Sequence, residues 1–211
     1  MAGCCVPKGY DAVFDARQAR RDARRYRRRG LSKAARRLVR LAAPDGGNVL
    51  EIGGGVGAIQ IELLKAGAER ATNVELSPGY EEEAARLLRE AGLTERVERR
   101  VTDFVAAADE LEPADVVVMH RVVCCYPDPE RLVGAAAVHA RRRLVLTYPP
   151  DSPLSRLVSA GFNVWCAARR VDFRSYVHPP HVILAAARAH GLESTVEGRT
   201  AIWHYAAFER G

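Results

Sequence analysis

Short apolar runs alternate with segments of helical spacing along most of the chain. The apolar runs predict five buried strands, at 49–52, up to 75, 97–101, 115–120 and 143–148. The segments between them predict helices at 58–65, from 77 to about 91, from 128 onward, and from about 180 to 190. Strands that alternate with helices are typical of an α/β fold with a mostly parallel sheet and helices on both faces.

The two ends of the chain depart from this alternation. Residues 1–10 are expected to be a loose leader, followed by two helices over 11–30 and 31–41 that Gly30 and Ser32 separate. Residues 192–197 and 201–208 alternate around Gly198-Arg199, which predicts an antiparallel hairpin. We therefore expect an arginine-rich helical cap over 1–30 and one α/β domain over 31–211.

Residues 151–175 follow no clean period. They predict a helical insertion, from about 151 to 175, that shapes a substrate pocket; an amphipathic helix packed on the core is an equally compatible interpretation. We expect the region around Phe162 and Trp165, together with the helix that carries Tyr26, to close over the rim of that pocket.

The first strand ends in a glycine-rich turn that predicts a nucleotide-type site. Its sequence is Glu51-Ile52-Gly53-Gly54-Gly55-Val56-Gly57. Glycine permits positive φ, and without a Cβ it lets a flat ligand lie against the main chain. The second apolar run ends in Glu75, near the spacing at which an acidic residue meets a ribose hydroxyl pair.

This E-x-G-x-G-x-G motif resembles the first motif of class I S-adenosylmethionine-dependent methyltransferases. Gly53, Gly55 and Ala58 also fit the loose dinucleotide pattern G-x-G-x-x-A, but a pyrophosphate would be repelled by Glu51. Adenosylmethionine has no phosphates, and its ammonium group needs a nearby carboxylate. The resemblance implies S-adenosyl-L-methionine as cofactor and S-adenosyl-L-homocysteine as product, over about residues 31–211 in a Rossmann-like sheet with a C-terminal antiparallel hairpin.

The resemblance also implies where the cofactor binds. The cofactor-binding candidates are Glu51, Gly53, Gly54, Gly55, Gly57, Glu75, Leu76, Asp103, Phe104 and His120. The acidic-aromatic pair Asp103-Phe104 resembles the adenine-binding position of the family, with the carboxylate on the exocyclic amine and the ring beside the base.

The catalytic candidates come from the ends of the fourth and fifth strands, because ligands in open α/β sheets bind beyond the carboxyl ends of strands. They are His120, Tyr126 and Tyr148, with His178 as a further possible base. Methyl transfer is an in-line displacement from a sulfonium, so alignment supplies most of the acceleration and a base is needed only if the acceptor loses a proton.

More faintly, the order of landmarks resembles the magnesium-protoporphyrin methyltransferase branch. The matching segments are Tyr126-Pro127, Tyr148-Pro149-Pro150 and Tyr176-Val177-His178. The glycine motif departs from that branch at Glu51-Ile52-Gly53-Gly54, and the cysteine pairs are absent from it. The resemblance implies the reaction type and the architecture, and no porphyrin substrate is inferred.

Charge leaves the acceptor class open. The 211 residues carry a net charge of +6, and eight arginines crowd positions 17–29. Such a surface attracts anions, but no interleaved aromatic residues of the kind that grip single strands accompany it. We expect a small-molecule acceptor, with an acidic one compatible with the charge, and keep an RNA or protein methyltransferase as the alternative. No signal peptide or membrane-length apolar run is present, so a cytoplasmic protein that does not bind membranes is expected.

The five cysteines give a second alternative. Cys4-Cys5 and Cys124-Cys125 are adjacent pairs, which are not zinc knuckles, and Cys166 stands alone. We expect reduced, metal-free thiols. The sharper hypothesis is a thiol or metalloid methyltransferase, or a non-catalytic protein that binds adenosylmethionine or thiols through the joined pairs.

Overall fold

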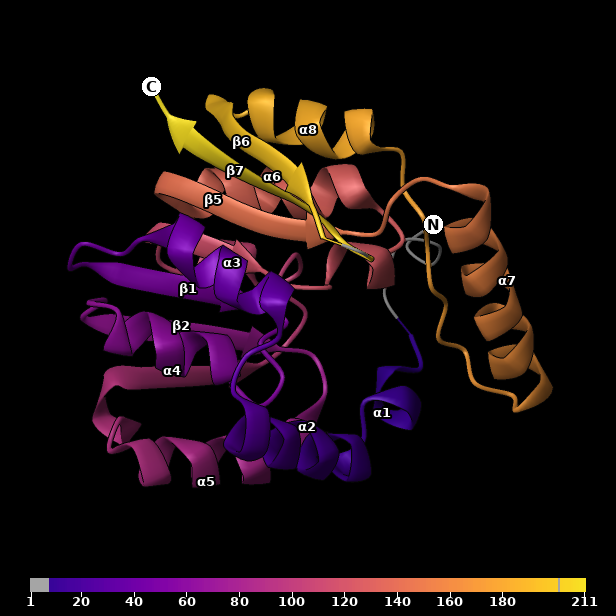
Figure 1. Cartoon of the computed structure of the whole chain (residues 1–211), viewed down its shortest axis with the longest axis horizontal. Helices are drawn as coiled ribbons and strands as arrows, with labels where there is room; N and C mark the ends of the chain where they lie inside the picture. Colours follow the sequence, from indigo (N-terminus) through magenta and orange to yellow (C-terminus); the bar gives the residue numbers. More distant parts are fainter. Residues whose placement is uncertain (1–7, 201) are drawn as a thin grey trace.

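One mixed sheet organises the molecule. The structure is a computed structural model that describes residues 8–200 and 202–211. In these residues seven strands form one sheet in the order β3-β2-β1-β4-β5-β7-β6 (Figure 1). The strands are β1 (Asn48–Ile52), β2 (Arg70–Glu75), β3 (Val97–Val101), β4 (Ala114–Met119), β5 (Ala140–Tyr148), β6 (Leu192–Arg199) and β7 (His204–Arg210). Strands β1 to β5 are parallel, and β7 is antiparallel to both β5 and β6. The predicted α/β sheet with a C-terminal antiparallel hairpin is confirmed.

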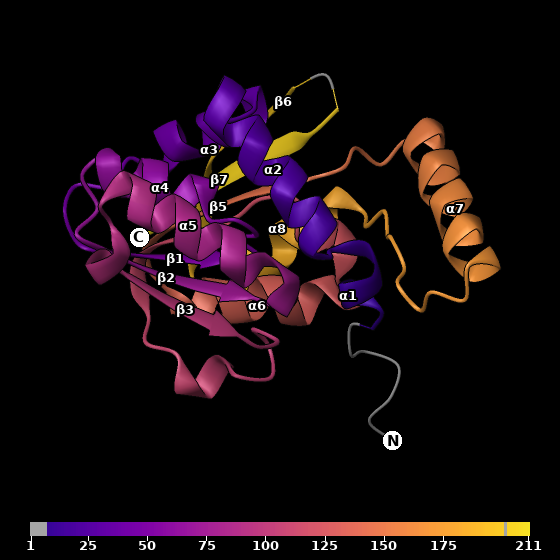
Figure 2. The same cartoon turned by 90° about the horizontal axis from the view of Figure 1, so that it is seen from below.

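Helices cover both faces of the sheet. Helices α3, α4 and α5 lie on one face and α6 and α8 on the other, while α2 packs on α5 (Figures 1 and 2). The helices are α1 (Tyr10–Val13), α2 (Ala16–Arg29), α3 (Lys33–Ala42), α4 (Ala58–Lys65), α5 (Glu81–Ala91), α6 (Pro129–His139), α7 (Pro153–Ala168) and α8 (Pro180–Arg188). Short 3-10 helices are η1 (Pro78–Tyr80), η2 (Thr94–Arg96), η3 (Ala108–Glu110) and η4 (Val123–Cys125).

The central strand β4 is buried on both faces of the sheet. Val117 and Val118 of β4 are neighbours in sequence, and both are fully buried. Val117 belongs to the apolar cluster under α6 and α8, whereas Val118 belongs to the cluster under α3 and α4. The sequence of a strand buried on both faces is a continuous apolar run, and this run is the reason that β4 could be predicted from the sequence.

Three local expectations were wrong. The helix expected over 11–30 is broken after Val13, because the Asp15 carboxylate accepts a hydrogen bond from the N–H of Gln18 and begins a new helix there. The helix expected from residue 77 begins as the 3-10 turn η1 and is α-helical only from Glu81, and the Ser77 hydroxyl donates to the carbonyl of Phe14 at 2.6 Å. Gly198 and Arg199 belong to β6, so the hairpin turn follows them.

Helix α7 stands apart from the sheet and its covering helices (Figures 1 and 2). Its polar side chains Ser159 and Asn163 hydrogen-bond to the backbone of Ser175, whereas Leu157 is 69% exposed. Among the described helices, none is both long and apolar enough to cross a bilayer. Cys4 and Cys5 lie outside the described residues.

Candidate functional site

The glycine loop after β1 brings main-chain amides to the carboxyl edge of the sheet. Gly55 has φ +53°, and its N–H donates to Glu75 Oε2 at 2.8 Å. Gly57 has φ +76° and directly precedes α4. Both conformations lie in the left-handed region that favours glycine, so the loop turns sharply from the strand into the helix.

Gly54 leaves no room for a side chain. A Cβ at this position would overlap the Asn73 amide and would lie 2.8 Å from the Glu51 carboxyl carbon. The loop is therefore pressed against the ends of β1 and β2. Any larger residue would displace the two polar side chains that line this edge.

Glu51 is a buried acid, and only one of its two carboxylate oxygens accepts hydrogen bonds from the described residues. It is 2% exposed, and its Oε2 accepts hydrogen bonds from the Gln60 N–H and the Asn73 side-chain amide, both at 3.1 Å. Within the described part of the chain, no hydrogen bond uses Oε1. Burial raises the pKa of the Glu51 carboxyl to about 8, against the lowering effect of these hydrogen bonds and of the Arg99 charge. A cationic group beside Oε1 would favour the ionised form.

Glu75, at the end of β2, ties the loop to the next strand. Its two oxygens accept from the N–H groups of Gly55 and Ser77 at 2.8 and 2.9 Å. Burial raises the pKa of Glu75, while these hydrogen bonds and the nearby Arg99 lower it. Each oxygen has a second lone pair, so the carboxylate can still accept hydroxyl hydrogen bonds from a ligand.

Arg99 of β3 anchors the glycine loop by hydrogen bonds. The sequence did not identify it as a site residue. Its guanidinium donates to the Gly55 carbonyl at 2.9 Å and to the Glu81 carboxylate at 2.7 Å. The one available signal was an arginine on a strand next to Glu75, since β3 pairs with β2 and Asn73 lies opposite Arg99.

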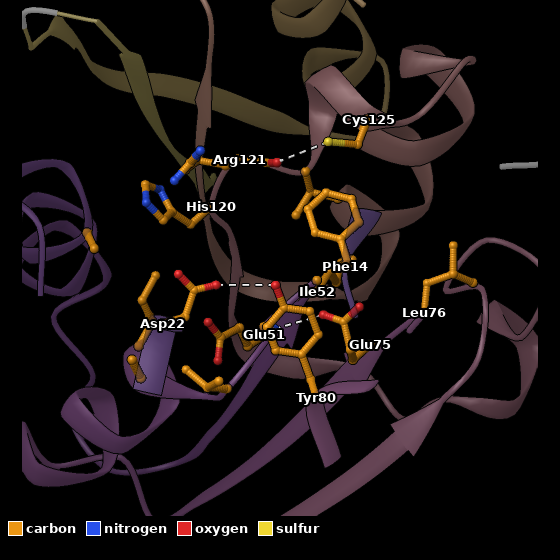
Figure 3. A pocket seen from close by; sticks show the side chains of 18 of the residues that line it. Phe14, Asp22, Glu51, Ile52, Glu75, Leu76, Tyr80, His120, Arg121 and Cys125 are labelled. Carbon is orange, nitrogen blue, oxygen red and sulfur yellow. Dashed lines mark hydrogen bonds between the residues drawn. The ribbon is translucent and has the colours of Figure 1, made fainter. Parts of the chain in front are cut away.

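A cavity of about 340 Å³ opens above this edge (Figure 3). Its volume falls in the range of small-molecule sites. Most predicted site residues line it: Glu51, Gly53, Gly54, Gly55, Glu75, Leu76, Asp103, Phe104, His120 and Tyr126. Gly57 and Tyr148 are not among the lining residues.

Asp103 and Phe104 lie at the wall that β3 and the following loop form. Asp103 Oδ1 accepts from the Val105 N–H at 2.9 Å, and the Tyr126 hydroxyl lies 3.4 Å from Oδ2. The Phe104 ring packs edge-on against His139 with centroids 5.3 Å apart. Burial, and next the charge of Asp103, raise the pKa of Tyr126, so its phenol stays protonated.

His120 is held in one orientation by Thr147. The Thr147 hydroxyl lies 3.0 Å from His120 Nδ1, and its oxygen accepts from the Arg121 N–H at 2.9 Å. Thr147 is fully buried, and its proton has no other acceptor among the described residues, so it is assigned to Nδ1. Burial, with the nearby Arg121 charge, lowers the pKa of His120 to about 3. The ring is therefore neutral, with its proton on Nε2.

Two of the other acid–base candidates lie away from the cavity. Tyr148 is 3% exposed because it belongs to the apolar cluster under α6 and α8, and its ring packs edge-on against His204 of β7. His178 Nε2 lies 2.9 Å from the Tyr126 carbonyl oxygen, which makes it a brace for that segment. The geometry gives neither group access to a bound acceptor.

The N-terminal helices form the roof of the cavity. Tyr10, Phe14, Gln18, Asp22, Arg25 and Tyr26 all line it. The Tyr80 hydroxyl lies 3.2 Å from Asp22 Oδ2, which ties α2 to the segment after β2 (Figure 3). The sequence singled out Tyr26, and Arg25 only as one of the arginines of positions 17–29; the other four give no signal in a stretch dominated by arginines.

A short aromatic chain links α7 to the roof, although no described residue of α7 lines the cavity. The Phe162 ring meets Phe173 at 5.8 Å between centroids, and Phe173 meets Tyr10 and Phe14 at 5.2 and 5.4 Å. Trp165 stacks on Phe162 and is 46% exposed. The expected closure of this insertion over the rim is therefore not seen; α7 supports the roof from outside.

Arginine and tryptophan complete the far wall. The Arg121 guanidinium lies over the Trp203 ring at 5.2 Å, and both residues line the cavity with Arg25. In residues 8–200 and 202–211, neither Arg25 nor Arg121 forms an ion pair with a carboxylate. Arg121 has φ +64°, an uncommon conformation for a residue with a side chain.

Comparisons with known proteins agree with this arrangement. A family model described as a methyltransferase domain matches residues 23–196. No curated protein matches the sequence at a significant level.

Solved structures with the same fold include three groups of methyltransferases. Magnesium protoporphyrin IX methyltransferase from Synechocystis PCC 6803, with bound SAH, is 19% identical, with TM-score 0.65 over 94% of this chain and 84% of that chain. An O-methyltransferase family protein from Burkholderia thailandensis is 18% identical, with TM-score 0.70 over 96% and 63% of the two chains. Geranyl diphosphate C-methyltransferase from Streptomyces coelicolor A3(2), with bound geranyl diphosphate and S-adenosyl-L-homocysteine, is 14% identical, with TM-score 0.68 over 84% and 76%.

Proposed function

The chain belongs to the methyltransferase-domain family, and on that premise we propose that it transfers a methyl group from S-adenosylmethionine to a small-molecule acceptor. The observation that carries the proposal is the pair of buried carboxylates, Glu51 and Glu75, on either side of the glycine loop. Glu75 suits a ribose, and Glu51 suits a cationic group that favours its ionised form, whereas a pyrophosphate beside the Glu51 carboxylate would be repelled.

The residues present fit this cofactor. The unused Oε1 of Glu51 can accept from the ammonium group, and the second lone pairs of Glu75 can accept from the ribose hydroxyls. Asp103 keeps Oδ2 free of backbone contacts for the adenine amine, and Phe104 forms the adjoining wall. Leu76 also lines the cavity and would pack against the adenine. When bound, the cofactor supplies an electrophilic methyl group on a sulfonium.

The acceptor half of the cavity has a different character. Tyr10, Phe14 and Trp203 offer aromatic surface, while Arg25 and Arg121 offer positive charge that no carboxylate of the described residues neutralises. An acceptor with an apolar body and one carboxylate or phosphate group would satisfy both features. Geranyl diphosphate, the ligand of one structural neighbour, has this combination.

His120 donates a hydrogen bond to the methyl acceptor. Its Nδ1 is occupied by Thr147, and its low pKa keeps the ring neutral, so the free position carries Nε2–H. Such a group orients an oxygen or nitrogen of the acceptor and does not remove its proton. Tyr126 remains protonated for the same reason of burial and acts as a second positioning group.

The protein's contribution to rate is then enclosure and alignment. The roof of α1 and α2 excludes water, and the loop amides and carboxylates fix the donor from the opposite side. Holding the nucleophile in line with the methyl group is worth several orders of magnitude in rate without any base.

A labelled-donor screen tests the proposal. We expect methyl transfer to amphipathic acids in preference to neutral analogues of the same size, and we expect Arg121→Ala to raise KM for the acid without changing adenosylhomocysteine affinity. Transfer to neutral analogues at equal kcat/KM would show that the arginines do not select the acceptor. No transfer to any small molecule would favour a macromolecular substrate.

An RNA or protein acceptor is the second candidate, favoured by one observation. Helix α2 exposes a row of arginines without ion-pair partners among the described residues: Arg17, Arg20, Arg21, Arg24, Arg28 and Arg29. Tight filter binding of RNA that falls steeply with salt, and methylation of that RNA, would support this function over the first.

A further inference from the structure

Two adjacent thiols share the wall of the cavity. Cys124 and Cys125 both belong to η4 and both line the cavity, and their Sγ atoms are 3.6 Å apart. Each sulfur also lies 3.5–3.6 Å from the carbonyl oxygen of Arg121, a contact drawn for Cys125 in Figure 3. Neighbouring side chains usually diverge; these two converge.

The backbone of the pair is fixed on both sides. The Cys125 carbonyl accepts a hydrogen bond from the Tyr10 hydroxyl, and the Cys124 carbonyl accepts one from the Tyr176 N–H at 2.7 Å. The preceding Arg121 holds φ +64°, a conformation that persists only where surrounding contacts impose it. The convergence of the thiols is thus built into the fold, and a ligand that bridges them need not reorganise the chain.

The distance between the two sulfur atoms suits a pair of thiolates that bind the same thiophilic atom. Two thiolates bound tetrahedrally with bonds of about 2.3 Å lie about 3.8 Å apart, close to the separation seen here. Among the residues that the structure describes, no three His, Cys, Asp or Glu side chains converge on one point. A four-coordinate zinc site therefore lacks ligands, whereas an atom that needs only two sulfurs fits.

The thiols also differ in ionisation. The hydrogen bond from Cys125, and after it the Arg121 charge, lower the pKa of Cys124 despite its burial. The same hydrogen bond and burial raise the pKa of Cys125. Cys124 is therefore the more readily ionised thiol of the two and the better nucleophile.

We propose that Cys124 and Cys125 form a chelating dithiol site for trivalent arsenic that carries one carbon substituent. With an arsine oxide, two As–S bonds form, the As–O bond is lost, and the two thiol protons leave with that oxygen as one water molecule. Arsenic stays trivalent and no electron donor is needed. The carbon substituent occupies cavity space, so a bound arsenical excludes the acceptor. The site does not depend on the proposed methyl transfer.

Phenylarsine oxide is the probe, and the assay uses the full chain with Cys4→Ser and Cys5→Ser, which removes the other adjacent pair. We expect one equivalent to bind, two titratable thiols to disappear, and both to return with dithiothreitol but not with a comparable concentration of 2-mercaptoethanol. Chelation accounts for that difference, because a second sulfur on the same scaffold raises affinity by about 100-fold or more.

Single variants locate the site. Cys124→Ser and Cys125→Ser should each weaken binding by about 100-fold, and Cys166→Ser, a buried thiol of α7, should not change it. Binding of the probe that survives Cys124→Ser, or no stoichiometric binding by the parent protein, would overturn the proposal. Should a serine variant fail to fold, protection of Cys124 and Cys125 from alkylation in the parent protein decides: alkylation unaffected by the probe overturns it.

Discussion

The two halves of the cavity differ in the charge and in the hydrogen bonding of their side chains. On the cofactor side, Glu51, Glu75 and Arg99 come from the adjacent strands β1, β2 and β3, and each is hydrogen-bonded to the backbone of the glycine loop or of α4. On the acceptor side, Arg25, Arg121 and the aromatic roof come from segments distant in sequence, and the guanidinium groups have no carboxylate partners in the described ranges. The first half is preorganised for one ligand, whereas the second presents charge and surface that an acceptor must complete.

The largest effect that would break this contrast is the loss of Glu75. Glu75→Ala removes the acceptor for ribose hydroxyls and leaves the Gly55 and Ser77 amides unpaired. We expect adenosylhomocysteine affinity to fall roughly 100-fold, or on the order of 1–3 kcal/mol. Calorimetric titration measures it. The matched control Glu82→Ala, at an exposed acid of α5, should bind normally, and equal affinity for the two variants would remove Glu75 from the site.

Crowding the loop should have the next largest effect. Gly54→Ala places a methyl group against the Asn73 amide and the Glu51 carboxyl, and overpacking of this kind costs about 1–3 kcal/mol. We expect roughly 30-fold weaker cofactor binding at a cost near 2 kcal/mol. Gly161→Ala, on α7, where an added Cβ meets nothing within 4 Å, is the control. If both variants bind adenosylhomocysteine like the parent, the loop is not pressed on the ligand edge.

The pH dependence of binding sharpens the role of Glu51. A carboxyl with a pKa of about 8 is protonated in the free protein at neutral pH, but the cofactor ammonium needs its ionised form. Binding should therefore release a proton, and affinity should rise by roughly tenfold from pH 6 to pH 7. Calorimetry in buffers of different ionisation enthalpy counts the protons, and Glu51→Gln should release none.

The Glu51 carboxyl also makes the free energy of unfolding of the ligand-free protein decrease as pH rises. The folded chain keeps a proton that the unfolded chain loses near its ordinary value of 4.5. The Glu51 contribution to the free energy of unfolding is therefore full below pH 4.5 and is lost as pH rises to about 8. Urea unfolding at several pH values should show this slope in the parent and a smaller one in Glu51→Gln; an unchanged slope would contradict the shifted pKa.

The smallest expected effect separates charge from backbone strain at Arg121. Arg121→Ala and Arg121→Gly both remove the guanidinium, so both should lower kcat/KM for an acidic acceptor equally. Because φ is +64°, the glycine variant should be more stable to denaturant by about 1 kcal/mol. Equal stabilities would mean that the left-handed conformation is not imposed on the alanine variant.

The cofactor half could be predicted from the sequence because its residues are consecutive or set by one βαβ unit. Strand β1, the glycine loop and Glu75 follow from a local pattern of apolar, glycine and acidic positions. Arg99 escaped because its partners, Gly55 and Glu81, are 44 and 18 residues away. A long-range hydrogen bond leaves no mark on local periodicity.

The acceptor half could not be predicted in the same way. Phe14 and Asp15 break a segment that looks like one continuous helix, and this break lets Tyr10 reach the Cys125 carbonyl. Tyr148 lies at the end of its strand as expected, yet it belongs to the apolar cluster under α6 and α8 and does not line the cavity. The position of a residue along a strand was predictable, but what packs over it depends on chain segments that pair only in three dimensions.

Glu51 and Glu75 together should select a phosphate-free cofactor that carries an ammonium group, and a calorimetric comparison of two ligands distinguishes this from dinucleotide binding. Calorimetry of the parent protein with S-adenosylhomocysteine and with NAD compares the two ligands at the same site. We predict micromolar binding of S-adenosylhomocysteine, abolished or strongly weakened by Glu75→Ala, and NAD binding at least about 100-fold weaker, a difference of about 2.7 kcal/mol. NAD binding of comparable or higher affinity would show that the two carboxylates do not select against a dinucleotide.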